Sequence, residues 1–173
     1  MKIILKPIGD IDNPILDELK KGLELTFGCP VETASDDFNL EKAYDSRRKQ
    51  YLATRILHRH KKSRAAKGDK ILGVVDVDLY ATGLNFIFGQ ADTADGTAVI
   101  SLYQLRQEYY GMLPNEALFV DRAVKEAVHE LGHTFGLEHC PDEKCIMHFS
   151  NSLSDTDWKQ AAFCSQCRPK LIK

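Results

Sequence analysis

The sequence has no hydrophobic stretch that approaches the ~18 residues needed to span a membrane. Residues 1–5 are mostly apolar, but Lys6 and Pro7 end that run too soon for a signal peptide. Neither charge sign dominates, because the formal net charge is −2. The overall charge therefore indicates no particular class of binding partner. These absences predict a cytoplasmic chain with no membrane partner and no pro-segment.

Strands and helices are predicted to alternate along the first 136 residues. With 173 residues, 43% of them hydrophobic, the chain is long enough for one ordinary domain. Such alternation favours an α/β fold with a mixed, mostly parallel, twisted sheet and packed helices. The apolar spacing predicts strands over 2–8, 31–34, 71–79 and 98–105, and helices over 14–27, 40–62 and 118–135.

The chain changes character at Gly136. Residues 1–136 carry the predicted α/β elements and the motif described below. Residues 137–173 are rich in loops, with one short helix expected over 155–163. We expect both parts to form a single domain over 1–173, the second as a small subdomain.

Residues 129–139 read HELGHTFGLEH and fit the pattern H-E-x-x-H-x-x-G-x-x-H. His129 and His133 are four residues apart, so on a helix they project from one face and can bind one Zn²⁺ together. Glu130 lies about 100° around the same helix, outside the ligand pair but within reach of a metal-bound water. Gly136 suits the sharp turn that brings His139 back as a third ligand. Three imidazoles leave the fourth tetrahedral position for water, which a catalytic zinc requires.

Four of the five cysteines fall within 140–167 as two pairs, Cys140 with Cys145 and Cys164 with Cys167. Such a set suits a closed structural zinc, which would stabilise a segment with few apolar residues. Disulfides are the alternative in a hyperthermophile, and redox cysteines are a further one, although the strand-to-helix context of a redox C-x-x-C is missing. Cys29 is expected to be a plain packing residue.

The eleven-residue motif, followed by Met147, resembles the signature and methionine turn of the metzincin metallopeptidases. The four cysteines narrow this resemblance to the archaemetzincin family over 126–168. It implies a metzincin-like zincin fold with a small zinc-stapled C-terminal subdomain. The implied roles are catalytic zinc ligands for His129, His133 and His139, general base for Glu130, floor of the metal site for Met147, and structural zinc ligands for Cys140, Cys145, Cys164 and Cys167.

The resemblance also implies two Zn²⁺ per chain and hydrolysis of peptide bonds in a peptide or protein substrate. We expect narrow specificity, aminopeptidase-like or for short peptides, because an unrestricted cytoplasmic protease is hazardous. The alternative is a zinc-binding adaptor protein with little or no proteolytic activity. Phe149 departs from certain relatives, which carry a tyrosine two positions after the turn methionine. A monomer is favoured.

Three further features have weaker interpretations. An edge strand within 85–92 is expected beside the cleft, where it either pairs with the substrate or is an ordinary edge. The segment 47–70 has ten Lys or Arg and one acid, and is expected to be a solvated helix face and not a nucleic-acid site. His58 and His60 are expected at the surface, whereas His148 either lines the cleft or is an exposed loop histidine.

Overall fold

The computed structural model describes residues 1–62, 66 and 68–172. Its main sheet has five strands in the order β2-β1-β5-β8-β7. All neighbours pair in parallel except β7 and β8, which are antiparallel. The predicted α/β class with a mostly parallel sheet is therefore confirmed. The strands are β1 (Ile3–Pro7), β2 (Val31–Thr33), β5 (Lys70–Val75), β7 (Gly89–Asp92) and β8 (Thr97–Ser101).

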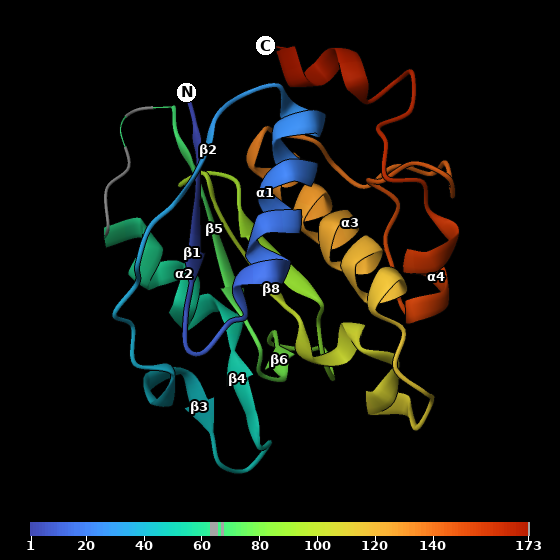
Figure 1. Cartoon of the computed structure of the whole chain (residues 1–173). Coiled ribbons are helices and arrows are strands. Elements are labelled where there is room, and N and C mark those ends of the chain that lie inside the picture. The colour runs from blue at the N-terminus through green and yellow to red at the C-terminus, as the bar shows by residue number, and fades with distance from the viewer. Residues whose placement is uncertain (63–65, 67, 173) are drawn as a thin grey trace.

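Helices cover both faces of this sheet (Figure 1). On one face lie α1 (Asn13–Phe27) and α3 (Glu116–Thr134), and on the other lies α2 (Ala53–Lys62). Strand β8 shows why its sequence is apolar throughout. Ala98 and Ile100 belong to the core beneath α1 and α3, whereas Val99 belongs to the core beneath α2.

Helices α1 and α3 can pack closely because Gly22 of α1 has no side chain at their contact. A Cβ atom on Gly22 would lie 2.7 Å from Val124 Cγ1. At the end of α1, Phe27 stacks on Phe135 with ring centroids 5.1 Å apart, and Gly28 ends the helix with φ of 64° as predicted. This contact anchors α3, the helix that carries the histidine motif.

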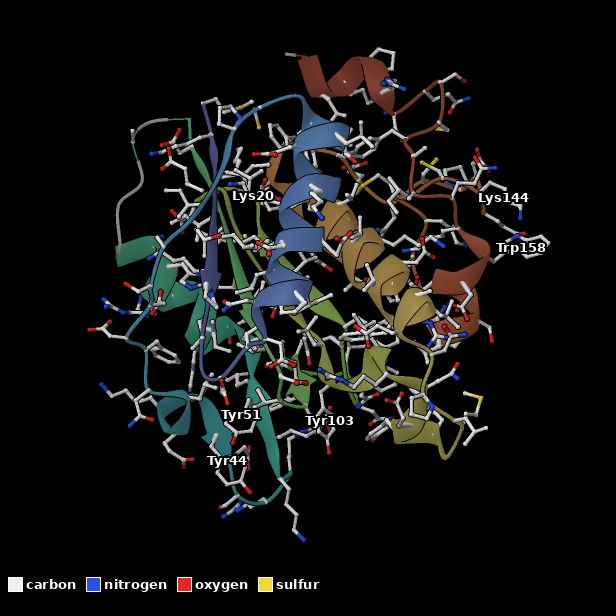
Figure 2. The ribbon with its side chains drawn as sticks, viewed as in Figure 1. Lys20, Tyr44, Tyr51, Tyr103, Lys144 and Trp158 are labelled. Atoms are coloured by element: carbon white, nitrogen blue, oxygen red, sulfur yellow. The ribbon has the colours of Figure 1, made fainter. Side chains whose placement is uncertain are left out.

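The predicted helix over 40–62 is wrong for its first half. The chain forms a 3-10 helix, η1 (Leu40–Ala43), then a hairpin of β3 (Tyr44–Asp45) and β4 (Gln50–Leu52) before α2. The Asp45 carboxylate accepts the backbone N–H groups of Arg47 and Arg48, which builds the turn. Tyr44 and Tyr51 then pack across the hairpin, 5.0 Å between ring centroids (Figure 2). Tertiary pairing of β4 with β6 (Leu79–Tyr80) outweighs the helical spacing.

Other predicted bounds shift by a few residues. The strand predicted over 71–79 ends at Val75, and the one predicted over 98–105 ends at Ser101. The 3-10 helices η2 (Tyr103–Leu105) and η3 (Gln107–Tyr110) follow it. Near the C-terminus, α4 (Leu153–Trp158) is shorter than expected and starts with a capping box of Ser152 and Asp155. The 3-10 helix η4 (Arg168–Ile172) follows.

His60 is buried, so its expected surface position is wrong. Its ring packs against Gly73 on β5, where an added Cβ would clash with the imidazole. Its Nε2 lies 3.5 Å from Asp36 Oδ2, which also pairs with Lys6 Nζ at 3.3 Å. Of the basic segment 47–70, Arg64 and Lys67 lie outside the described residues.

Candidate metal centre and active site

Helix α3 places the first two histidines and the glutamate near its C-terminal end. The helix starts at an N-cap, Asn115, whose side chain accepts the backbone N–H of Leu118 at 3.1 Å. Gly136 then has a φ of 85°, in the left-handed region that glycine adopts without strain. This turn reverses the chain and brings His139 beside His129 and His133, as predicted.

The three imidazoles converge on one point. The Nε2 atoms of His129 and His133 lie 3.2 Å apart, and one ring nitrogen from each histidine lies within 4.8 Å of the others. A tetrahedral zinc with Zn–N bonds of about 2.0–2.1 Å requires nitrogens about 3.3 Å apart. The arrangement therefore fits a zinc ion with three nitrogen ligands.

Backbone carbonyls orient the first two rings. His129 Nδ1 lies 2.8 Å from the carbonyl oxygen of Ile146, and His133 Nδ1 lies 2.7 Å from that of Leu137. With the proton on Nδ1, each ring donates to its carbonyl and leaves the Nε2 lone pair toward the common point. Such outer contacts are typical of histidines that bind metals.

All three histidines favour the neutral form. Burial lowers the pKa of His129 well below its usual value, and the nearby Lys159 charge lowers it further. Burial is also the main cause that lowers the pKa of His133 and of His139. Neutral imidazoles are the form that binds a metal.

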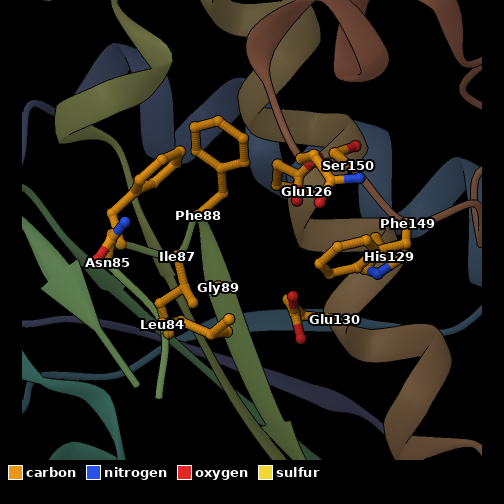
Figure 3. Close-up of a pocket in the computed structure, with 12 residues that line it drawn as sticks. Leu84, Asn85, Ile87, Phe88, Gly89, Glu126, His129, Glu130, Phe149 and Ser150 are labelled. Atoms are coloured by element: carbon orange, nitrogen blue, oxygen red, sulfur yellow. The ribbon is translucent and has the colours of Figure 1, made fainter. Parts of the chain in front are cut away.

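Glu130 faces a pocket of about 250 Å³ next to this cluster (Figure 3). Burial, and then the charge of Glu126, raise the pKa of Glu130 well above its usual value. Strand β7 comes so close that a Cβ on Gly89 would lie 2.5 Å from Glu130 Cγ. One wall is formed by residues 84–89 and the other by residues of α3 together with residues 149–151.

Met147 is fully buried. It packs against Gly132 on α3, where an added Cβ would clash with the Met147 sulfur. Glycine at this helix position therefore admits the methionine. The ring of Phe149, two residues on, is tilted against that of His139 with ring centroids 4.9 Å apart, and it offers no phenolic oxygen there.

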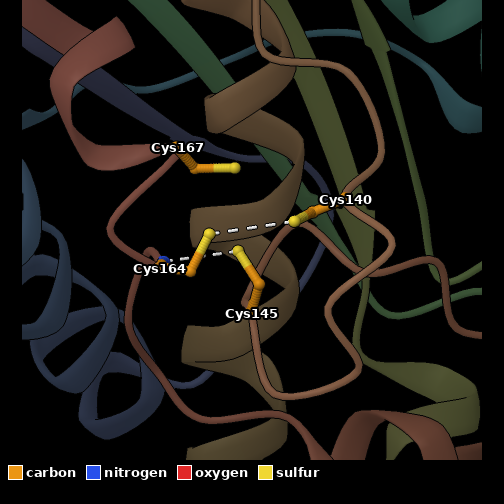
Figure 4. A group of neighbouring side chains, drawn as sticks. All are labelled: Cys140, Cys145, Cys164 and Cys167. Atoms are coloured by element: carbon orange, nitrogen blue, oxygen red, sulfur yellow. Dashed lines mark hydrogen bonds between the residues drawn. The ribbon is translucent and has the colours of Figure 1, made fainter.

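The four cysteines form a second cluster (Figure 4). Their sulfurs all lie within 4.8 Å of one another, and those of Cys140 and Cys164 are 3.8 Å apart. Four Zn–S bonds of about 2.3 Å place tetrahedral sulfurs about 3.8 Å apart, whereas a disulfide bond is about 2.05 Å long. The thiols are free and fit a zinc ion better than two disulfides. Cys29 lies apart and packs against the core, as expected.

The thiols differ in how readily they lose a proton. Burial opposes ionisation of Cys164, but backbone N–H groups of Cys167 and Gln166 and the neighbouring thiols outweigh it and lower its pKa to about 7. Burial, and then hydrogen bonds to the other cysteines, raise the pKa of Cys167. A cluster with one readily formed thiolate suits a cation that displaces the remaining protons.

Short contacts connect the two clusters. Cys140 directly follows His139, and its N–H donates to the carbonyl of Met147 at 2.9 Å. The His148 ring Nδ1 lies 2.9 Å from the Cys140 carbonyl oxygen. His148 lines a separate hollow with Trp158 and Asp155, not the pocket of Glu130. The backbone of Cys140 thus connects the third histidine to the methionine segment.

The comparisons with known proteins agree with this geometry. The model of Peptidase family M54 matches residues 18–173. The chain belongs to peptidase family M54, the archaemetzincins. It is a zinc metallopeptidase. The archaemetzincin of Pyrococcus furiosus is 45% identical, covering 98% of this chain and 91% of that protein.

Solved structures show the same family fold. A zinc-dependent peptidase from Methanocorpusculum labreanum superposes with a TM-score of 0.90 at 32% identity, covering 98% of this chain and 99% of that chain. The archaemetzincin of Methanopyrus kandleri superposes with a TM-score of 0.84 at 39% identity, covering 99% and 93%. The expected metzincin-like fold is confirmed. Among the described residues, no helix is both long and apolar enough to cross a membrane.

Two buried residues near this family site escaped the sequence reasoning. Glu126 lines the pocket one turn before Glu130, and the spacing on α3 was a usable signal. Lys159, which directly follows α4, contacts Glu126. Its position in a loop-rich segment gives no periodic spacing from which this contact could have been predicted.

Proposed function

We propose that this metallopeptidase cleaves peptide bonds with Glu130 as general base beside a zinc held by His129, His133 and His139. The observation that carries the proposal is the convergence of three neutral imidazoles next to a buried carboxylate in a pocket. Bound there, a zinc ion supplies Lewis acidity, which acidifies a water molecule and polarises the substrate carbonyl.

Glu130 has the proton-transfer role. Its carboxylate accepts the proton of the attacking water and passes it to the leaving amine. Burial raises the pKa of Glu130 and so favours proton uptake by that carboxyl, whereas a bound cation would act in the opposite direction. Cys140, Cys145, Cys164 and Cys167 hold a second, structural zinc in this proposal, which gives two zinc ions per chain.

Strand β7 binds the substrate backbone in this proposal. It is the last strand of the sheet, so one of its edges is free. Ser101 N–H donates to the Phe88 carbonyl at 2.8 Å. In an antiparallel pair, successive residues of a strand point their N–H groups alternately toward the partner strand and away from it. The N–H groups of Gly89 and Ala91 therefore face the free edge of β7. An extended peptide can pair there beside Glu130.

The pocket supports a narrow specificity for short peptides. Its volume of about 250 Å³ and its aromatic walls, Phe86, Phe88 and Phe149, suit one large apolar side chain of the substrate.

The role of β7 can be tested with Ala91→Pro, which removes an N–H group at the free edge and keeps the pairing with β8. We expect weaker peptide binding with zinc content unchanged. Unchanged peptide affinity would leave β7 as an ordinary edge strand.

The deciding experiment compares Glu130→Gln with wild type on a peptide library, with zinc content measured in both. We expect the variant to keep its zinc and to lose turnover by about 10²- to 10⁴-fold. Glu138→Gln is the matched control, because Glu138 is an exposed glutamate of the same motif. Full turnover in Glu130→Gln would refute the assigned role, whereas no cleavage by zinc-loaded wild type would favour an adaptor protein.

A further inference from the structure

A fully buried lysine lies behind the pocket, directly after α4. The ammonium Nζ of Lys159 lies 3.3 Å from Glu126 Oε1 and 3.3 Å from the carbonyl oxygen of His148. Thr156 donates a further hydrogen bond to Glu126 Oε1 at 3.1 Å. A buried charge is costly unless it is paired and hydrogen-bonded, so these contacts hold their partners tightly in place.

The two groups that Lys159 binds belong to two different segments that together form one wall of the pocket. Glu126 is on α3 and lines the pocket one turn before Glu130. His148 directly precedes residues 149–151, which line the pocket beyond the histidines. Figure 3 shows Glu126 and Ser150 together at one end of the pocket, away from Glu130. The ammonium therefore sets the distance between α3 and the segment 148–151 of this wall.

The other polar contacts of this wall reach α3 through α4 or from the side of the histidines. Among the described residues, the Asn151 N–H donates to Asp155 Oδ2 at 2.9 Å, which ties the wall to α4 and not to α3. Two residues before His148, the Ile146 carbonyl lies within hydrogen-bond distance of His129 Nδ1, but that contact belongs to the histidine cluster. Helix α4 is itself bonded to α3, because Arg122 donates to the Asp157 carboxylate. Lys159 makes the shorter connection, since its ammonium contacts both Glu126 of α3 and the His148 carbonyl at the start of the wall.

We propose that Lys159 is a positioning residue: it holds the segment 148–151 against α3 and so fixes the shape of the pocket for a substrate side chain. This inference rests on the proposed function, in which the pocket receives that side chain. Lys159 acts through the two groups that it binds, the Glu126 carboxylate and the His148 carbonyl.

Two variants separate positioning from charge balance. Lys159→Met keeps the length of the side chain but leaves the Glu126 carboxylate buried without its cation. The double variant Glu126→Gln with Lys159→Met removes both charges, so it retains the fold while the His148 carbonyl stays unbound. Lys144→Met is the matched control, because Lys144 lies at the surface and contacts Trp158, the last residue of α4 and the neighbour of Lys159 (Figure 2).

The first measurement is ligand binding by the zinc-loaded full chain. Acetohydroxamate, which has no side chain, is compared with a hydroxamate that carries a benzyl group, and Kd is measured by calorimetry. We expect the preference for the benzyl compound to fall about tenfold in Lys159→Met and in the double variant, on the scale of one lost polar contact. The same preference in wild type and double variant would overturn the inference.

The second measurement is amide hydrogen exchange over residues 148–151, which requires neither ligand nor turnover. We expect exchange at least ~10-fold faster in Lys159→Met and in the double variant, and unchanged in Lys144→Met. Wild-type exchange rates in both Lys159 variants would equally overturn the inference. Wild-type protein that binds the hydroxamates but cleaves no peptide would refute the proposed function alone.

Discussion

The three-histidine cluster and the four-cysteine cluster differ in how open they are. His139 is exposed and His133 is partly exposed, and Glu130 beside them faces a pocket. Three of the four cysteines are buried, and all four sulfurs lie within 4.8 Å of one another, so together they can fill the four positions of a tetrahedral zinc. An open cluster leaves room for water and substrate, whereas a closed one leaves room only for the ion. The same metal would therefore have two different tasks within one chain.

The clusters also differ in what positions their ligands. Two histidines are held by α3, a helix of 19 residues that packs on α1 and on the sheet without a metal. The cysteines all lie in irregular segments between Cys140 and Cys167. Zinc would occupy a site that the histidines already form, but it would be a cross-link for the segment that carries the cysteines.

The largest expected effect is that of Cys145→Ser. Loss of a buried thiolate ligand removes the cysteine zinc, and we expect the free energy of unfolding to fall by about 5 kcal/mol or more. Thermal unfolding and native mass spectrometry measure stability and zinc content. Cys29→Ser is the control and is expected to change stability by less than ~1 kcal/mol. Equal effects of the two substitutions would remove the distinction between the clusters.

His133→Ala tests the other side of the comparison. We expect turnover to fall to background and one zinc to be lost, because two imidazoles bind the ion poorly. The exchange protection of residues 140–167 is expected to stay at the wild-type level, since the cysteine zinc is retained. Hydrogen exchange with mass spectrometry measures this directly. A loss of protection over 140–167 would show that the two clusters fold as one unit.

His60 shows what burial does to a histidine outside both clusters. Burial, only partly offset by Asp36, lowers the pKa of His60 to about 4 from 6.5. The unfolded chain therefore binds this proton more readily, and folded stability falls as pH drops from about 6.5 to about 4. The difference of about 2.5 units corresponds to about 3 kcal/mol. In His60→Gln, the free energy of unfolding is expected to fall less between pH 7 and pH 4.5 than in wild type, because the contribution of His60 is absent. Urea unfolding at the two pH values measures this difference. Parallel stability curves of the two proteins would contradict it.

The smallest expected effect is kinetic. A chelator such as 1,10-phenanthroline reaches the open histidine cluster more easily than the closed cysteine cluster. We expect release of the first zinc to be about tenfold faster or more, a barrier difference of about 1.4 kcal/mol. Zinc release is followed with a chromogenic dye, and turnover is sampled at the same times. Activity that disappears only with the slow phase would reverse the assignment of the two clusters.

Local geometry made the histidine motif predictable. Residues four apart on a helix share a face, so the placement of His129 and His133, with Glu130 beside them, follows from spacing alone. Gly136 and the C-x-x-C pair are equally local, since a turn needs one glycine and a ligand pair needs a short loop. The alternation of strands and helices likewise gave the α/β class, because periodicity is a property of each segment.

Tertiary structure decided the rest, because contacts between distant residues leave no local pattern. The hairpin within 40–62 forms through pairing with β6, and His60 is buried by β5. Gly89 approaches Glu130 only because β7 is the edge beside α3. Lys159 reaches Glu126 across 33 residues of chain. The sequence by itself therefore determined which residues gather in the histidine and cysteine clusters, whereas the fold determined the pocket beside them.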